Sequence, residues 1–210
     1  MNFKDEGFYH LYNRGINRKT VFFTSEHYKY FLWKVKKYLK PRCDILAYCL
    51  MPNHFHFLIY CSSIYNSSNY ISRPTTLSRR TTEPLPDSQI IHPVSQAVRI
   101  ILSSYARGIN LQKTRTGSLF QQSTKAKFLK AEDHPLTVFN YIHQNPMRGG
   151  IANHVDDWQF SSFREYFPSS VSNICNTELA HQLLDLPTKN DLFTFSSKIV
   201  DEFKHWPNCQ

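Results

Sequence analysis

The sequence has no pair of cysteines spaced as C-x-x-C, although five cysteines are scattered over its 210 residues. An odd number of widely spaced cysteines predicts neither a disulfide framework nor a cysteine zinc site. No apolar run is long enough to span a bilayer, the first residues show no apolar segment behind their charges, and no internal repeat is found. These absences favour a globular protein of the reducing cytoplasm, without a membrane partner.

Acidic residues are scarce relative to basic ones. Asp and Glu number 16 against 25 Lys and Arg, so the formal net charge is +9 at pH 7. This excess favours a polyanionic partner such as nucleic acid, although the sign alone would also fit a membrane surface. Aromatic residues make up 15% of the chain, and some are interleaved with basic ones, as at residues 27–30. Such rings suit base stacking, but most single rings are expected in the core.

Hydrophobic periodicity predicts the element order strand, helix, strand, strand, helix, strand, helix. The expected elements are a strand at 8–12, a helix from about Ser25 to Pro41, hairpin strands at 45–50 and 55–60, a helix at 94–109, a strand at 126–130, and a helix that Asp133 caps and that stops before Pro146. This order matches an α+β, ferredoxin-like (split βαβ) sandwich with an antiparallel sheet.

Two segments fall outside this pattern. Residues 61–92 are rich in Ser, Thr, Asn and Pro with embedded arginines, which predicts a long polar, basic loop insertion. Beyond residue 167 the signal weakens, and short helices are expected at 178–184 and 192–203. We therefore predict a domain over residues 1–167 and a C-terminal helical tail over residues 168–210.

His54 and His56 lie in the second strand of the predicted hairpin. Because side chains alternate along a strand, both imidazoles should project from one face, with Phe55 on the other. Such a pair can chelate a divalent ion and leaves positions open for a phosphate oxygen. The pair alone is weak evidence, since ten histidines produce such spacings by chance. A cupin-like site would need a nearby carboxylate, and the next one is Glu83, across the polar loop.

Tyr141 and Asn145 are four residues apart, so they share one face of the last predicted helix of the domain. Each has an ordinary alternative explanation. A helical tyrosine usually packs in the core, and a residue before proline, here Pro146, usually ends a helix. Their interest comes from their combination with the histidine pair.

Two motifs together resemble a known family. Residues 51–59 read Met-Pro-Asn-His-Phe-His-Phe-Leu-Ile, and residues 141–151 read Tyr-Ile-His-Gln-Asn-Pro-Met-Arg-Gly-Gly-Ile. This pair is similar to the REP-associated tyrosine transposases, which belong to the IS200-like, single-tyrosine branch of the HUH nucleases. Shorter matching stretches lie at 12–15, 21–23, 47–50, 117–121 and 158–162, so the resemblance covers roughly residues 8–167.

The resemblance implies a metal-dependent endonuclease and strand transferase, a transposase, acting on single-stranded DNA at hairpin-forming palindromes. His54 and His56 would hold Mg²⁺ or Mn²⁺, with Asn145 close to the ion. Tyr141 would be the nucleophile that forms a 5′-phosphotyrosine intermediate. That linkage conserves phosphodiester energy, so a 3′-hydroxyl could reverse the step and join new DNA without ATP.

Basic and polar residues near these motifs are candidates for DNA contact because guanidinium and ammonium groups match phosphates. They are Asn13, Arg14, Lys125, Lys127 and Arg148. A tyrosine has an unperturbed pKa near 10, so the ion or a base must help to remove its proton. Candidates for that base are His143, Lys125 and Lys127, and the sequence does not decide among them.

Other interpretations stay open at this level. A ferredoxin-like sheet with exposed rings could be a non-catalytic nucleic-acid binding module. A metal-dependent enzyme for small molecules has little support beyond the histidine pair. The sequence leaves open whether the protein is a monomer or a homodimer, and whether Tyr141 serves its own site or a partner's. After residue 121 the chain also departs from the family pattern, which leaves the DNA sequence preference open.

Overall fold

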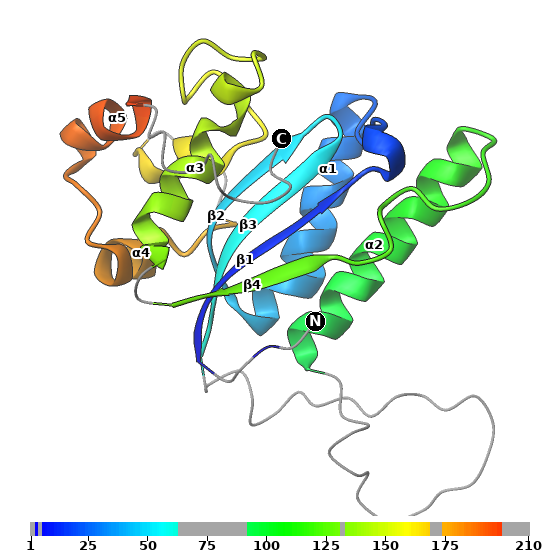
Figure 1. Cartoon of the computed structure of the whole chain (residues 1–210), viewed down its shortest axis with the longest axis horizontal. Helices are drawn as coiled ribbons and strands as arrows, with labels where there is room; N and C mark the ends of the chain where they lie inside the picture. Colours follow the sequence, from blue (N-terminus) through cyan, green and yellow to red (C-terminus); the bar gives the residue numbers. More distant parts are fainter. Residues whose placement is uncertain (1–2, 4–5, 63–91, 131–132, 169–173, 199–210) are drawn as a thin grey trace, which may run out of the picture.

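A computed structural model describes residue 3 and residues 6–62, 92–130, 133–168 and 174–198. Within these ranges the chain forms an antiparallel sheet of four strands in the order β2-β3-β1-β4 (Figure 1). The strands are β1 (Gly7–Arg14), β2 (Asp44–Met51), β3 (His54–Cys61) and β4 (Lys125–Leu129). With the helices between them, this order confirms the predicted ferredoxin-like sandwich.

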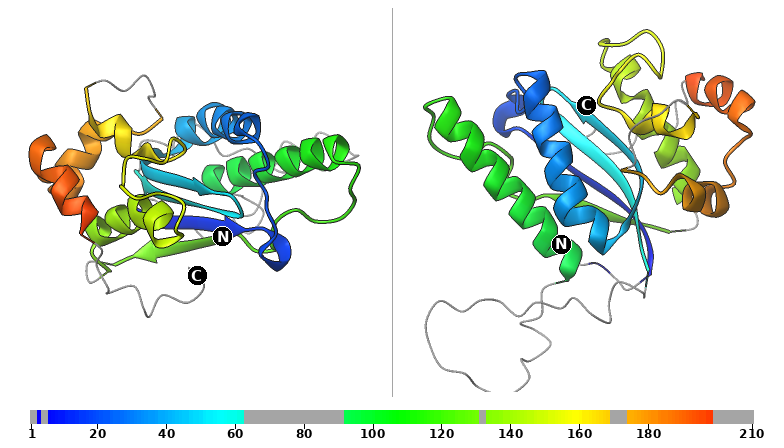
Figure 2. Two further views of the ribbon diagram at one scale, coloured as in Figure 1. Left: turned by 90° about the horizontal axis from the view of Figure 1, so that it is seen from above. Right: turned by 180° about the vertical axis from the view of Figure 1, so that it is seen from behind.

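The longer helices lie on both faces of the sheet. Helices α1 (Ser25–Lys34) and α2 (Pro93–Gln112) cover one face. Helix α3 (Pro135–Arg148) packs on the other face, against β2 and β3, as the two views of Figure 2 show. Shorter helical segments complete the described fold: η1 (Ile16–Arg18), η2 (Val35–Leu39), η3 (Lys40–Arg42), η7 (Ser162–Tyr166), α4 (Thr177–Leu184) and α5 (Lys189–Ser197).

Alternate side chains of β1 and β3 enter two different cores. Leu11 and Phe57 pair across the two strands and pack beneath α1 and α2. Leu58, the next residue of β3, belongs to the cluster formed with Phe139 and Ile142 of α3. Both faces of the sheet are therefore partly covered by apolar packing, and the even-numbered residues of β3 face α3.

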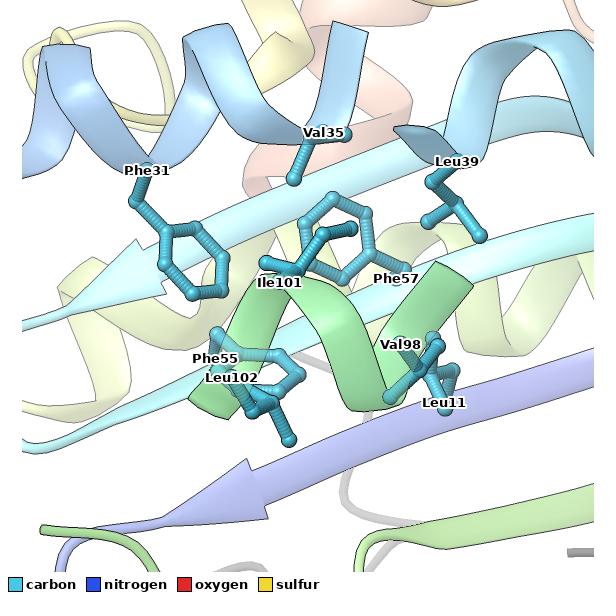
Figure 3. Close-up of a pocket in the computed structure, with 9 residues that line it drawn as sticks. All are labelled: Leu11, Phe31, Val35, Leu39, Phe55, Phe57, Val98, Ile101 and Leu102. Carbon is cyan, nitrogen blue, oxygen red and sulfur yellow. The ribbon is translucent and has the colours of Figure 1, made fainter. Parts of the chain in front are cut away.

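A small apolar pocket lies in the first core, between the sheet and helices α1 and α2 (Figure 3). Its volume is about 10 Å³. Its lining side chains are Leu11, Phe31, Val35, Leu39, Phe55, Phe57, Val98, Ile101 and Leu102. A gap of this size with no polar lining group is a packing imperfection, and it offers no place for a polar ligand.

Helix α3 does not end before Pro146, as the sequence suggested, but runs on to Arg148. Proline removes one backbone donor from the helix. In the same turn the Asn145 side-chain Nδ2 donates to the Tyr141 carbonyl over 2.8 Å, and Gly149 N donates to the Asn145 carbonyl over 2.8 Å. These bonds keep the final turn helical, so Tyr141 and Asn145 stay one turn apart on the same face.

The start of α3 also differs from the expectation. The residue before the helix is His134, whose φ of 43° is left-handed, and it makes no side-chain cap. The Asp133 carboxylate accepts instead from Lys130 N over 3.0 Å and from Lys127 Nζ over 2.6 Å. Asp133 therefore fastens the end of β4 and does not cap α3.

Other sequence expectations differ slightly from the structure or concern residues outside the described ranges. Strand β1 continues to Arg14, two residues past its expected end. Residues 63–91, nearly all of the basic loop expected at 61–92, lie outside the described residues, as do residues 199–203 of the helix expected at 192–203. Helix α4 coincides with the segment expected at 178–184. The division of the chain at residue 167 remains a prediction.

Candidate active site

The two histidines of β3 project toward α3. In the register of the sheet, His54 lies opposite Arg14 and His56 lies opposite Tyr12 of β1. The two imidazoles have ring centroids 5.0 Å apart and nearly perpendicular planes, at 84°. Phe55 between them enters the opposite core, so the strand alternation places both imidazoles on one face.

Hydrogen bonds fix how these rings are turned. His54 Nδ1 donates to Asn53 Oδ1 over 2.6 Å, and His56 Nδ1 lies 2.9 Å from His10 Nε2. The Nε2 atoms of His54 and His56 are buried and have no hydrogen-bond partner in the described part of the chain. Since His54 carries its proton on Nδ1, its Nε2 presents a lone pair. A buried lone pair of this kind fits a metal ligand.

The electrostatics of the pair favour neutral rings. The pKa of His54 is lowered to about 4, mainly by burial and next by the charge of the neighbouring Arg14, while the Asn145 side chain acts in the opposite direction. Burial also holds the pKa of His56 well below its ordinary value, with the charge of His54 as the next cause. Both imidazoles are therefore neutral near pH 7, which is the form that binds a cation.

Tyr141 of α3 faces two imidazole rings of the sheet, those of His56 and His10. Its ring lies edge-to-face with His56, with centroids 5.6 Å apart at 85°, and with His10 at 6.2 Å and 79°. The Arg148 guanidinium carbon lies 5.7 Å from the centroid of the Tyr141 ring, one side of which it covers. Tyr141 is only 3% exposed, but it is buried among imidazoles and a cation and not among hydrocarbon alone. The phenol and the histidine pair thus come together within one chain.

Asn145 lies one helical turn after Tyr141, beside His54. Its side chain is 5% exposed and its Nδ2 is engaged with the Tyr141 carbonyl. In the described residues, no group of three or more His, Cys, Asp and Glu side chains forms a metal site. The donor set is therefore two imidazole nitrogens and an amide, which fits an ion that keeps open positions for a phosphate and water.

Basic side chains line the β1–β4 side of the same sheet face. Lys125 lies opposite Tyr12 and Lys127 opposite His10, so their side chains share the face of the histidines. Both lysines are exposed. Lys127 Nζ makes an ion pair with Asp133 over 2.6 Å, which leaves Lys125 as the more available cation of the two. A role of Lys125 or Lys127 as the base for Tyr141 remains a prediction.

Asn13 has a different environment from the one expected of a DNA contact. It is 4% exposed, and its Nδ2 donates to Gln121 O over 3.2 Å and to Thr124 Oγ1 over 2.8 Å. Its Oδ1 accepts from Arg14 N over 2.6 Å. These bonds fasten the segment before β4 to β1 and leave little of the amide for a ligand.

His143, a candidate base in the sequence, is not brought to the phenol. It is fully buried, and its Nε2 lies 2.8 Å from Ser162 Oγ. Its ring packs edge-on against Phe139 and Phe163. Two residues along a helix turn a side chain through more than half a circle, so His143 points away from Tyr141 and into the α3 core.

Sequence reasoning did not single out His10, Tyr12 or Asn53, which surround the histidine pair. The ring of Tyr12 stacks on His10 at 4.7 Å and on His56 at 5.8 Å. The alternation of β1 places His10 and Tyr12 on one face, but only the pairing of β1 with β3 shows which face it is.

Comparison with known proteins gives a family for the first part of the chain. Residues 4–89 match the family model described as Transposase IS200 like, a segment that includes both histidines of β3 and ends before Tyr141. A Haemophilus influenzae protein named as a candidate REP-associated tyrosine transposase is 24% identical over 140 residues. These residues are 67% of this chain and 62% of that protein, so the chain spans less than two thirds of the length of this relative.

A solved structure resembles most of the chain in fold. It is a REP-associated tyrosine transposase bound to a REP hairpin, with a TM-score of 0.57, 17% identity, and coverage of 83% of this chain and 87% of that one. At this identity the likeness establishes the fold. Among the described helices, none combines the length and the apolar character of a membrane span. Residues 4–89 are therefore similar to the IS200-like transposase family, and the chain is distantly similar to REP-associated tyrosine transposases in sequence and in fold.

Proposed function

We propose that this protein is a transposase that cuts and joins single-stranded DNA at a hairpin, with Tyr141 as its nucleophile. The observation that carries the proposal is the edge-to-face approach of Tyr141 to His56, at 5.6 Å between ring centroids, beside two Nε2 atoms without partners. The family of residues 4–89 supports it. So does the fold of the neighbour whose title names a bound REP hairpin.

The residues that would hold a divalent ion, Mg²⁺ or Mn²⁺, are His54 and His56 through Nε2, with Asn145 beside them. When bound, such an ion withdraws charge from a phosphate and orients it. His54 is held for this role by Asn53, and Asn145 is held by the Tyr141 carbonyl. The chain itself therefore supplies a fixed set of donors on a strand and a helix, the elements that hold side chains most rigidly.

In the reaction that we propose, the Tyr141 Oη attacks the phosphorus of the scissile phosphodiester. The new bond joins Oη to phosphorus, the bond from phosphorus to the 3′-oxygen breaks, and that oxygen leaves as a 3′-hydroxyl after taking up a proton. The phenol loses its proton, and the cation of Arg148 over the ring stabilises the negative charge that develops there. Attack of another 3′-hydroxyl on the phosphotyrosine reverses these bond changes and joins the strands.

The DNA backbone would reach this site over the β1–β4 side of the sheet. Lys125, Lys127 and Arg14 line that side, and Arg148 lies at the phenol. Their positive charges suit phosphates, which give affinity without sequence preference. Tyr141 and the histidines come from one chain, so we propose that each site is complete in a single protomer. We also keep residues 1–167 as the proposed catalytic domain.

The test is a covalent trapping assay. The purified protein is incubated with a single-stranded DNA hairpin and Mn²⁺, and the adduct that survives denaturing electrophoresis is measured. We expect an adduct with the unchanged protein and none with Tyr141→Phe, because the variant keeps the ring and loses only the attacking oxygen.

The matched control is Tyr12→Phe. Tyr12 stacks on His56 from the same face of the sheet, so its phenol is a rival nucleophile. We expect this variant to keep the adduct. An adduct that persists in Tyr141→Phe and disappears in Tyr12→Phe would identify Tyr12 as the nucleophile in place of Tyr141. Hairpin binding without any adduct in the unchanged protein would favour a non-catalytic binding module.

A further inference from the structure

His10 of β1 lies behind the histidine pair and makes a direct contact with one of its members. His10 is fully buried, and its Nε2 lies 2.9 Å from His56 Nδ1. The two rings are stacked, with centroids 5.0 Å apart and planes at 20°. In the sheet His56 lies opposite Tyr12, two residues along β1, so His10 reaches it diagonally from the same face.

An imidazole that binds a cation through Nε2 must carry its proton on Nδ1. That proton then needs an acceptor, because a buried donor without a partner is unfavourable. His54 has Asn53 Oδ1 as its acceptor, over 2.6 Å. His56 has the His10 ring in the equivalent place, so each imidazole has a partner behind its Nδ1.

We infer that His10 is a positioning residue of the proposed site: its Nε2 accepts the Nδ1 proton of His56 and so keeps the His56 Nε2 lone pair turned toward Tyr141. This inference rests on the proposed function for the identity of the ligand. It requires one tautomer of His10, with the proton on Nδ1 and none on Nε2. No hydrogen bond from this buried Nδ1 atom is found in the described residues, so this tautomer places the unsatisfied donor on His10 and not on the ring that would hold the ion. The ring of Tyr12 contacts both imidazoles and so limits their rotation.

Two substitutions distinguish the role of His10 as a hydrogen-bond acceptor from the role of its ring in packing. His10→Phe fills the buried space without an acceptor, and His10→Gln keeps an acceptor oxygen. Mn²⁺ affinity is measured on the full chain from the electron paramagnetic resonance signal of the free ion, without DNA cleavage. Outer-shell partners of metal-binding histidines typically contribute about 10- to 100-fold to affinity. We expect a loss in that range for His10→Phe and a loss several times smaller for His10→Gln.

The control is His154→Ala, which removes an exposed imidazole outside this stack and should leave Mn²⁺ affinity unchanged. Hairpin binding in EDTA, measured in parallel, should stay within about twofold of the unchanged protein for every variant. Equal Mn²⁺ affinity in His10→Phe and the unchanged protein would overturn the inference. Equal losses in His10→Phe and His10→Gln would do the same, because they would indicate packing and not acceptance of a proton.

A measurement on the unchanged protein covers the case in which His10→Phe does not fold. Nitrogen-15 spectra of histidine-labelled protein in Mg²⁺ report which ring nitrogen carries a proton. We expect protons on Nδ1 of both His56 and His10. A His56 ring bare at Nδ1 would refute the inference. If the tautomers and Mn²⁺ affinities are as expected but Tyr141 forms no adduct, the proposed function fails and the role of His10 stands.

A different observation concerns the opposite face of the molecule, where two aromatic rings of α1 are open to solvent. Tyr30 is 42% and Trp33 50% exposed, and their rings are nearly parallel, with centroids 5.9 Å apart at 9°. Lys34 Nζ lies 4.5 Å from the Tyr30 centroid, and Lys37 Nζ lies 5.0 Å from the Trp33 centroid. We call Tyr30, Trp33, Lys34 and Lys37 the α1 aromatic surface.

The charge of this surface lacks a counterion within the described residues. Lys34 is 4% exposed, and neither it nor Lys37 takes part in the ion pairs found there, whereas Lys29, one turn earlier, is paired with Glu26. Flat exposed rings next to the exposed ammonium group of Lys37 match the two halves of a nucleotide, since bases stack on rings and phosphates approach cations. The buried Lys34 adds positive charge close to the Tyr30 ring. We propose that the α1 aromatic surface binds single-stranded DNA outside the active site.

This proposal is tested with two DNA ligands, the bare hairpin and the hairpin with a single-stranded extension of about ten nucleotides. Fluorescence anisotropy gives the affinity of the full chain for each. We expect the extension to strengthen binding, and the double variant Tyr30→Ala with Trp33→Ala to lose about tenfold or more of that gain. Affinity for the bare hairpin should stay unchanged, because α1 lies across the sheet from α3, the helix that carries Tyr141 (Figures 1 and 2).

The control is Leu111→Ala, which removes an apolar side chain that is 74% exposed on α2. It should leave both affinities unchanged. An extension that adds the same affinity to the double variant as to the unchanged protein would overturn the proposal. A double variant that changes the sedimentation of the protein and not its DNA affinity would assign the surface to a second copy of the chain, which also overturns it.

Discussion

At the scale of single residues, the chemistry of the site depends on two nitrogen atoms, Nε2 of His54 and Nε2 of His56. Both are buried and have no hydrogen bond in the described structure. A buried polar atom without a partner destabilises a fold by about 1–3 kcal/mol. Because ordinary folding would avoid two such atoms side by side, their presence favours a ligand that is bound during function.

Removal of the imidazole of either His54 or His56 should greatly slow the metal-dependent reaction. His54→Ala and His56→Ala are each expected to lower the rate of adduct formation by more than about 100-fold, since losing a ligand exceeds the usual effect of losing its outer-shell partner. Excess EDTA should do the same to the unchanged protein. The exposed His154 offers the control His154→Ala, which should keep the full rate. Unchanged rates in His54→Ala and His56→Ala would contradict a role in the reaction for a metal ion held by these histidines.

Part of this site could be predicted from the sequence because it depends on local geometry. The shared face of His54 and His56 follows from strand alternation, and the shared face of Tyr141 and Asn145 follows from helical spacing. The position of His10 could not be predicted, because it depends on the register between β1 and β3, which pairing far along the chain decides.

At the scale of secondary structure, the segment that follows α3 holds β2 and α3 together. Ser162 is fully buried and bridges them: its Oγ accepts from Tyr48 N over 2.8 Å and lies 2.8 Å from His143 Nε2. Just before it, Trp158 Nε1 donates to the Leu50 carbonyl over 2.8 Å, and Leu50 N donates to Phe160 O over 3.0 Å. These contacts explain why a stretch without regular strand structure has a definite place.

Ser162→Ala is therefore expected to destabilise the fold without changing the chemistry. It leaves the buried Tyr48 amide and the His143 ring without a partner, which predicts a loss of about 1–3 kcal/mol in the free energy of unfolding. Urea denaturation followed by circular dichroism measures it. The exposed Ser103 provides the control Ser103→Ala, which should change stability by less than about 0.5 kcal/mol. A stability equal to that of the unchanged protein would refute the structural role of Ser162.

Element boundaries show where sequence rules reach their limit. Pro146 predicted a helix end, but the tertiary setting of α3 against β2 and the hydrogen bonds of Asn145 keep the last turn in place. Asp133 looked like a helix cap and instead pairs with Lys127 of β4. In both cases a local preference gave way to contacts with another element, which no local pattern contains.

At the scale of the whole molecule, the net charge of +9 and the basic side of the sheet govern binding. If Arg14, Lys125, Lys127 and Arg148 each neutralise one phosphate, affinity for the hairpin should fall by about a hundredfold between 50 and 200 mM salt. Lys125→Gln should make the logarithmic slope shallower by about one unit. Anisotropy titrations at several salt concentrations measure both, and a slope near zero would contradict backbone binding at this surface.

We propose that one chain holds both Tyr141 and the histidines of its site, which predicts that two inactive variants do not complement each other. A mixture of the Tyr141→Phe and His56→Ala proteins should form no adduct, because neither chain then holds both groups. A shared site would restore about a quarter to a half of the activity, as mixed dimers combine one intact half from each chain. The same trapping assay measures it, with each variant alone as the control.

The central claim is that Tyr141 is the residue that becomes joined to DNA. The most direct measurement is peptide mapping of the trapped adduct by mass spectrometry after digestion of the protein and the DNA. We expect the nucleotide mass on the peptide that contains Tyr141, attached through a 5′-phosphate. Attachment to Tyr12 or to any other residue would contradict the account.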